Sequence, residues 1–240
     1  MRAPILFVSL IASIIVPLDG LSKGGISKTP ATHAEEKLLS FTYAFDRKLR
    51  PILEQKLLLT PASYGRMIRM HGPPETGESA VSVHCTGEGS TSTCFVTLTR
   101  AQANMDYTMQ VERGNDPLEK VKTIPVVRRD SELPISIATA FRDCLRIMIP
   151  DPGDPNQLHP LTVMDDDRIE FWLDEPDGET RKGERAERPG KRSKTLIRIG
   201  DLLARYCEVD NTEQTRLARE IKRQAASILA SEHRKRLKEG

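Results

Sequence analysis

The stretch of sequence that decides the fold runs from Val81 to Leu98 and reads VSVHCTGEGSTSTCFVTL. Two runs of alternating, largely β-branched residues flank a segment of Gly, Ser and Thr, a pattern typical of a β-hairpin. With Gly89-Ser90 as a two-residue turn, glycine takes the first central position that a type II′ turn favours. Counting outward predicts three pairs on one face, which are Cys85 with Cys94, Val83 with Val96 and Val81 with Leu98. The same count places His84 opposite Phe95 on the other face.

The hairpin brings two of the four cysteines together. Cys85 and Cys94 fall at a non-hydrogen-bonded pair, where Cα atoms approach to about 4.5 Å, a separation that a disulfide can bridge. Four cysteines allow three pairings. If the hairpin joins Cys85 to Cys94, then Cys144 pairs with Cys207 by elimination. The competing interpretation is a zinc site of four thiolates, but the sequence has no Cys-x-x-Cys spacing. We expect two disulfides and no cofactor.

The N-terminal residues have the character of a signal peptide. An apolar run from Ile5 to Val16 follows the positive Arg2 and has the length of a signal-peptide core. It is short for a membrane-spanning helix, which takes about 20 residues. We therefore expect a cleaved signal at 1–20, a flexible leader at 21–32, and export to a periplasmic or extracellular compartment. An uncleaved N-terminal anchor and an ordinary buried segment are the alternatives.

The rest of the chain, 33–232, is expected to form a single domain. Apolar residues at steps of three and four predict a long N-terminal helix from His33 to about Leu59. The other expected elements are strands at 65–71, 81–98 (the hairpin), 106–113, 120–128, 168–173 and 195–199, and helices at 133–149, 201–208 and from Asn211 onward. The early strands follow one another without intervening helices, which indicates an antiparallel meander. The predicted class is α+β, a twisted antiparallel sheet covered by amphipathic helices, with a C-terminal helix.

Two charged segments fall outside this pattern. Residues 176–194 contain one apolar side chain, Ala186, so we expect a mobile excursion that cannot bury enough surface to become ordered. The basic tail 233–240 is expected to fray. A net charge of +2 gives no overall case for nucleic-acid binding, and 5% aromatic residues argue against a surface that stacks sugars or bases.

The excursion and the strand before it carry the candidate interaction site. An exposed Trp172 beside Glu170 could anchor a protein partner, whereas a covering helix would make Trp172 part of the core. The candidate partner-binding residues are Trp172, Glu170, Arg181, Lys182, Arg185 and Arg188. The basic residues of the loop could also bind an anion. The acidic run Asp165–Asp167 could hold a hard cation such as calcium, but it lacks the spacing of an EF-hand, which favours a solvated turn.

The sequence contains no recognisable catalytic motif. It has no Gly-x-Ser-x-Gly elbow, no His-Glu-x-x-His and no glycine-rich phosphate loop. The leading hypothesis is an exported, non-enzymatic protein that binds a protein partner in the envelope or exterior, or contributes to envelope assembly. Because catalytic groups can assemble from distant residues, the alternative is an exported hydrolase with an acid/base site near Glu170, Asp174 and His159.

Overall fold

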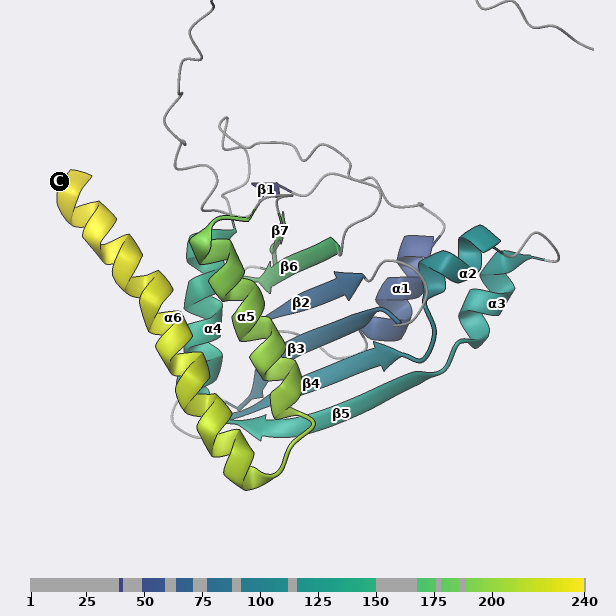
Figure 1. Cartoon of the computed structure of the whole chain (residues 1–240), viewed down its shortest axis with the longest axis horizontal. Helices are drawn as coiled ribbons and strands as arrows, with labels where there is room; N and C mark the ends of the chain where they lie inside the picture. Colours follow the sequence, from purple (N-terminus) through teal and green to yellow (C-terminus); the bar gives the residue numbers. More distant parts are fainter. Residues whose placement is uncertain are drawn as a thin grey trace, which may run out of the picture. The chain divides into compact units, whose positions relative to one another are not determined.

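The computed structural model describes residues 39–40, 49–58, 64–70, 77–87, 92–111, 116–149, 168–175, 178–185 and 189–239. These residues form six helices and one seven-stranded antiparallel sheet with the order β1-β7-β6-β2-β3-β4-β5 (Figure 1). The strands are β1 (Leu39–Ser40), β2 (Gly65–Met70), β3 (Ser79–Thr86), β4 (Thr93–Ala101), β5 (Val126–Leu133), β6 (Arg168–Asp174) and β7 (Thr180–Glu184). The helices are α1 (Leu49–Leu57), α2 (Met105–Val111), α3 (Pro117–Thr123), α4 (Ile135–Met148), α5 (Lys191–Tyr206) and α6 (Asn211–Glu239). The predicted α+β class is confirmed.

The hairpin is the β3–β4 pair, and its register is the predicted one. Cys85 pairs with Cys94, Val83 with Val96 and Val81 with Leu98. The Cys85–Cys94 disulfide is present, with its Cα atoms 3.9 Å apart. Closing a loop of this length stabilises the fold by roughly 2.5–3 kcal/mol in the chain-entropy view. The turn Gly89-Ser90 lies outside the described residues, as do the predicted signal peptide and leader.

The two faces of the sheet are covered by different helices. Alternation along β2, β3 and β4 sends Met67, Val83 and Val96 to one face, where they pack against α4, α5 and α6. Their neighbours Ile68 and Ala80 point to the other face and pack against α1, α2 and α3. Figure 1 shows α5 running across the strands, with α4 and α6 beside it. Each face therefore has its own apolar core.

Three predicted strands are wrong in whole or in part, because their local pattern is also compatible with a helix. Residues 106–113 fall mainly in α2, whose first turn is stabilised by side-chain acceptors: Glu78 accepts from Met105 N at 2.9 Å and Asn104 accepts from Tyr107 N at 2.8 Å. Residues 120–128 are divided between α3 and the start of β5. Residues 195–199 belong to α5, where Leu196, Ile199, Leu203 and Tyr206 are buried at helical spacing.

The predicted N-terminal helix and mobile excursion also need correction. The described part of 33–59 contains strand β1 and the nine-residue α1 rather than one long helix. Within 176–194, β7 pairs with β6 and α5 begins at Lys191. The charged residues of β7 are ordered because long Lys and Arg side chains supply apolar stems as well as charge.

The predicted Cys144–Cys207 disulfide is wrong, because both thiols are free and buried. Cys144 on α4 faces α6, where its Sγ lies 3.8 Å from the carbonyl oxygen of Ala225. Cys207, which follows α5, faces β4, with its Sγ 3.5 Å from the carbonyl oxygen of Val96. Burial raises the pKa of each thiol to about 12. The two cysteines act as small core residues.

Candidate functional site

The predicted partner-binding residues Trp172 and Glu170 lie on the sheet face that packs against α1. Trp172 is 6% exposed and Glu170 is 0% exposed, so neither presents an anchor to a partner. Arg50 of α1 donates two hydrogen bonds to the Glu170 carboxylate, at 2.8 and 2.7 Å. The Trp172 indole donates to the same carboxylate at 3.1 Å. The alternative in which Trp172 belongs to the core is confirmed.

These residues are part of a larger set of buried and partly buried residues, the Trp172 network, formed by Arg50, Arg66, Arg168, Glu170, Trp172, Lys182 and Glu184. Burial alone would lower the pKa of Arg50, but the hydrogen bonds and charge of Glu170 raise it above its ordinary value. Burial raises the pKa of Glu184. Since buried charges are stable only with their partners in place, this network fixes α1 and β7 against β6.

The cations of the network surround the Trp172 ring. Lys182 stands opposite Trp172 in the β6–β7 register, and its Nζ lies 3.7 Å from the ring centroid. The guanidinium carbons of Arg50 and Arg66 lie 5.2 and 5.5 Å from it. Cations at such distances are attracted to the face of an indole. Burial lowers the pKa of Lys182, as expected for an ammonium group removed from water.

The remaining predicted site residues are not gathered into one site. Arg181 donates to the carbonyl oxygen of Ile149 at 2.6 Å, and Arg185 follows β7 with its backbone N–H bonded to Ile169. Asp174, predicted as part of an acid/base site, accepts from Arg66 at 3.0 Å. Arg188, His159 and Asp165–Asp167 lie outside the described residues. The described part of the predicted hydrolase site therefore consists of two carboxylates in ion pairs.

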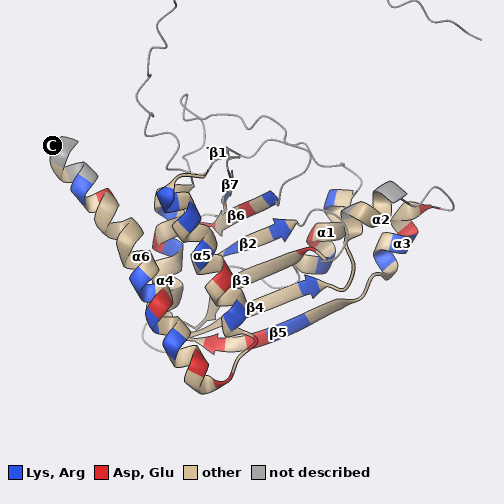
Figure 2. Ribbon diagram, in the orientation of Figure 1, with Lys and Arg blue, Asp and Glu red and all other residues tan. Residues whose placement is uncertain are grey.

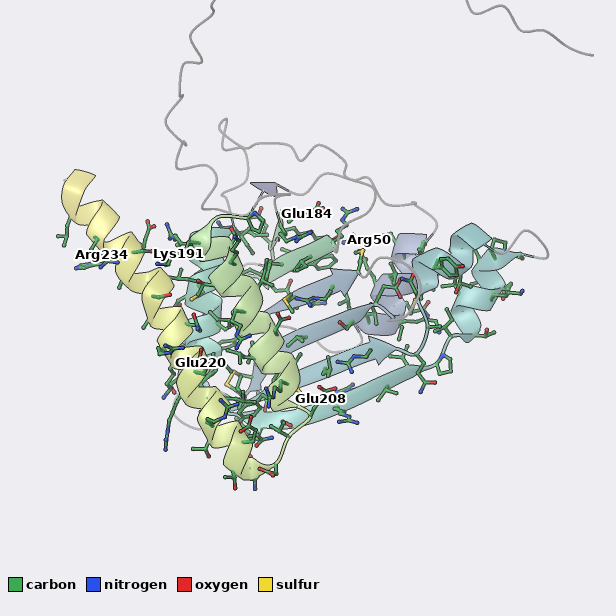
Figure 3. The ribbon with its side chains drawn as sticks, in the orientation of Figure 1. Arg50, Glu184, Lys191, Glu208, Glu220 and Arg234 are labelled. Carbon is green, nitrogen blue, oxygen red and sulfur yellow. A yellow bond between two sulfur atoms is a disulfide. The ribbon has the colours of Figure 1, made fainter. Side chains whose placement is uncertain are left out.

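A concave site lies on the opposite face of the sheet, beside α5. It is a groove of about 950 Å³. Its floor is mainly apolar and includes Met67, Val81, Leu98 and Ala101, while Ala204 and Glu208 belong to the wall formed by α5 and the turn after it. Figure 3 labels Glu208 at this end of α5. The volume lies within the range of small-molecule sites, about 300–1,000 Å³.

The shape of the groove depends on a glycine within α5. A Cβ atom at Gly200 would lie 2.2 Å from Sδ of Met67. The absence of a side chain therefore lets α5 approach β2 closely at this point. The next turn of α5 carries Asp201, Ala204 and Arg205, which border the groove above β4 and β5.

Four arginines and two carboxylates line the groove. Arg69 pairs with Asp201 at 2.7 Å, and Arg100 pairs with Glu208 at 3.0 Å. Arg205 pairs with Glu213 at 3.0 Å, outside the lining, and Arg129 forms no ion pair with a described residue. The side chain of Arg100 is 50% exposed. The groove thus has an excess of partly exposed guanidinium groups around an apolar floor.

Sequence reasoning missed this site because its lining comes from four strands and the end of α5. A weak signal was present nevertheless. Arg69, Arg100 and Arg129 occupy the positions that follow Met67, Leu98 and Val127 on the same sheet face, where alternation calls for an apolar residue. Arg69 and Arg100 lie in one row across the sheet with Ser79 between them, and Arg129 lies in the adjacent row opposite Leu98, so three arginines interrupt an otherwise apolar face.

Comparisons with protein-family models, with curated proteins and with solved structures find no match for this chain. Its chemistry must be argued from its own residues.

The arginines of the groove are suited to binding an anion. Guanidinium groups form paired, charge-assisted hydrogen bonds with carboxylates, sulfonates and phosphates. The one hydroxyl among the described lining residues, Ser79, has neither histidine nor cysteine beside it in that lining. The described residues also contain no group of three His, Cys, Asp or Glu side chains placed to hold a metal ion.

The hairpin disulfide bears on the compartment of the protein. The disulfide fits an exported protein, because such bonds persist in oxidising compartments. Among the described residues, every helix is too short or too polar to cross a membrane. A protein partner in the envelope remains a prediction that no described feature tests.

Proposed function

We propose that this chain is an exported, non-enzymatic binding protein whose groove beside α5 takes up a small organic anion with an apolar body. The observation that carries the proposal is the combination of a 950 Å³ groove, an apolar floor and four lining arginines. The apolar floor favours the body of the ligand, since burial contributes about 25 cal/mol for each Å². The arginines favour the charged head.

The arrangement of the ion pairs supports uptake of an anion. Asp201 and Glu208 keep Arg69 and Arg100 in the groove when no ligand is bound. Exposed pairs of this kind contribute about 0–1 kcal/mol, so an incoming carboxylate or phosphate can replace Glu208 at little cost. Arg129, on the edge strand β5, offers a further guanidinium at the open side.

The test uses two fluorescent probes that differ by one charged group. Anilinonaphthalene sulfonate has an aromatic body and a sulfonate, and N-phenyl-naphthylamine is the same fluorophore without the sulfonate. We expect the full chain to bind the sulfonate more tightly. Arg100→Gln with Arg129→Gln should weaken sulfonate binding about tenfold, the loss expected for one charge-assisted hydrogen bond at a partly exposed site. Binding of the uncharged probe should not change.

The matched control is Arg219→Gln with Lys222→Gln, which removes two exposed positive charges from α6, outside the groove lining. Circular dichroism of each variant checks that the fold is intact. Equal weakening by the control and the groove variant would show that the sulfonate responds only to net charge. Unchanged sulfonate binding in the groove variant would overturn the proposed site.

A further inference from the structure

A second basic surface lies at the opposite end of α5 from the groove. Lys191, Lys194 and Arg198 are exposed and recur at steps of three and four residues, so they lie on one stripe of the helix. The last turns of α6 read HRKRLKE from His233 onward, and His233 and Arg234 are exposed. These segments are far apart in the sequence.

The packing of α5 against α6 brings the two basic segments together. Arg205 near the end of α5 pairs with Glu213 near the start of α6, at 3.0 Å. Arg192 at the start of α5 pairs with Glu232 near the end of α6, also at 3.0 Å. The helices are therefore antiparallel neighbours, and the first turn of α5 lies beside the last turns of α6. Figure 3 shows Lys191 and Arg234 at these neighbouring ends.

We call this surface the basic end, formed by the exposed residues Lys191, Lys194, Arg198, His233 and Arg234. Segments 189–198 and 231–238 together contain eight Lys and Arg against one acidic residue, Glu232, although the whole chain has a net charge of only +2. Figure 2 shows the blue residues gathered on the first turns of α5. Positive charge is thus concentrated where the first turns of α5 lie beside the last turns of α6.

The charges at the start of α5 are unfavourable for the isolated protein. The first turn has no acidic residue, and Gly190 at the N-cap provides no side-chain acceptor. A helix N-terminus carries partial positive charge, so cations placed there reduce helix stability. An external surface rich in negative charge would remove this penalty.

The end of α6 projects beyond the packed core. Ile228 is its last residue buried in the core, and Leu237 is 69% exposed. A helix end that gains nothing from tertiary packing is only marginally stable in water. It presents an apolar side chain within a basic sequence.

We propose that the basic end docks on the surface of an anionic lipid bilayer. Clusters of four to eight Lys and Arg are attracted to such surfaces, each residue near the headgroups raising the affinity about fivefold, and Leu237 can enter the interface. The nucleic-acid alternative is less favoured, because segments 189–198 and 231–238 contain no Phe, Tyr or Trp on which bases could stack. This docking is independent of the groove and leaves it accessible.

The experiment is co-flotation of the full chain with vesicles of phosphatidylcholine alone or mixed with phosphatidylglycerol. We expect binding to the anionic vesicles only, and weaker binding as salt is raised. The variant Lys191→Gln with Lys194→Gln should lose about fivefold in affinity for each charge, hence roughly 25-fold. The matched control, Lys120→Gln with Lys122→Gln, removes two exposed lysines from α3 and should bind like the parent.

Several outcomes would overturn this proposal. They are equal binding to neutral vesicles, equal losses in the two double variants, and tighter binding to duplex DNA or release by inorganic phosphate at low concentration. Because Lys191 and Lys194 do not line the groove, their variant should bind anilinonaphthalene sulfonate like the parent. A negative result for vesicle binding is thereby distinguishable from a negative result for sulfonate binding in the groove.

Discussion

The two faces of the sheet carry similar residues in opposite physical states. On the face covered by α1, Arg50 and Glu170 form a buried bidentate pair beneath Trp172. On the face covered by α5, Arg100 pairs with Glu208 through a single hydrogen bond and is half exposed. The arginines are chemically the same, but water reaches only one of them. Charge on the first face contributes to the fold, whereas charge on the second is available to a ligand.

The difference follows from how many partners each guanidinium has and how well they are shielded. Arg50 also donates to Glu54 at 2.7 Å, so its hydrogen-bonding capacity is largely used within the protein. Removing such a buried partner leaves a charge without compensation, while an exposed partner is replaced by water. Substitutions on the two faces should therefore have very different effects on stability and on binding.

The largest effect is expected for Glu170→Gln. Loss of the carboxylate leaves the buried Arg50 charge without its bidentate partner, so the free energy of unfolding should fall by about 3–5 kcal/mol. Arg100→Gln, on the other face, should change it by less than about 1 kcal/mol. Urea denaturation of the disulfide-intact chain measures both values.

A double variant keeps this prediction testable if Glu170→Gln does not fold. Arg50→Met with Glu170→Leu removes both charges and fills the space with apolar groups, which is often neutral or stabilising for a buried pair. We expect the double variant to be more stable than Glu170→Gln. A cost below about 1 kcal/mol for Glu170→Gln would show that the network contributes as little as a surface pair.

The elements predicted correctly from the sequence are those whose residue pattern lies within the element itself. The β3–β4 hairpin has its alternation and its turn residues within 18 residues, and α4 has a continuous apolar stripe ended by Pro150. Strand β6 was also predicted, at 168–173. In each case the apolar residues keep one spacing, that of a strand or that of a helix, over the whole element.

The elements predicted wrongly depend on partners distant in the sequence. Strand β7 is ordered by Trp172 and by Arg168, not by apolar residues of its own. Helix α2 begins where Glu78, 27 residues earlier, accepts its first N–H group. The groove depends on the register of four strands and on where α5 crosses them, which no local pattern specifies. A charged segment can be ordered by its neighbours even when its composition suggests otherwise.

Thiol labelling tests whether solvent in the groove reaches the residues beneath α5. Cys207 directly precedes the groove residue Glu208, but it is buried and burial raises its pKa to about 12. Since thiolate is the reactive form, we expect no alkylation of the native chain. In denaturant, two thiols should react without reductant and four with it, by intact mass.

The number of modified thiols separates three structures. Rapid labelling of one thiol in the native state, mapped to Cys207, would show that water enters beneath α5 and that the two faces differ less than described. If no thiol reacts in denaturant without reductant, Cys144 and Cys207 form a disulfide after all. If four thiols react in denaturant without reductant, the hairpin disulfide is absent.

The smallest effect concerns His84, on the face opposite the groove, whose ring stacks on Phe95 with centroids 5.5 Å apart. Burial lowers the pKa of His84; the charge of Asp130 raises it and that of Arg128 lowers it. Because the folded chain then binds the proton less readily than the unfolded chain, the contribution of His84 to stability is present above the ordinary value of about 6.5 and is lost as the pH falls below it. The melting temperature should therefore fall between about pH 7.5 and about pH 5.5 by more in the parent than in His84→Gln.

His233→Gln, which removes an exposed histidine of α6, is the control, and its melting temperature should change with pH as that of the parent does. An unchanged slope in His84→Gln would mean that water reaches this ring as it reaches the arginines of the groove, and the contrast between the faces would then be confined to the Trp172 network.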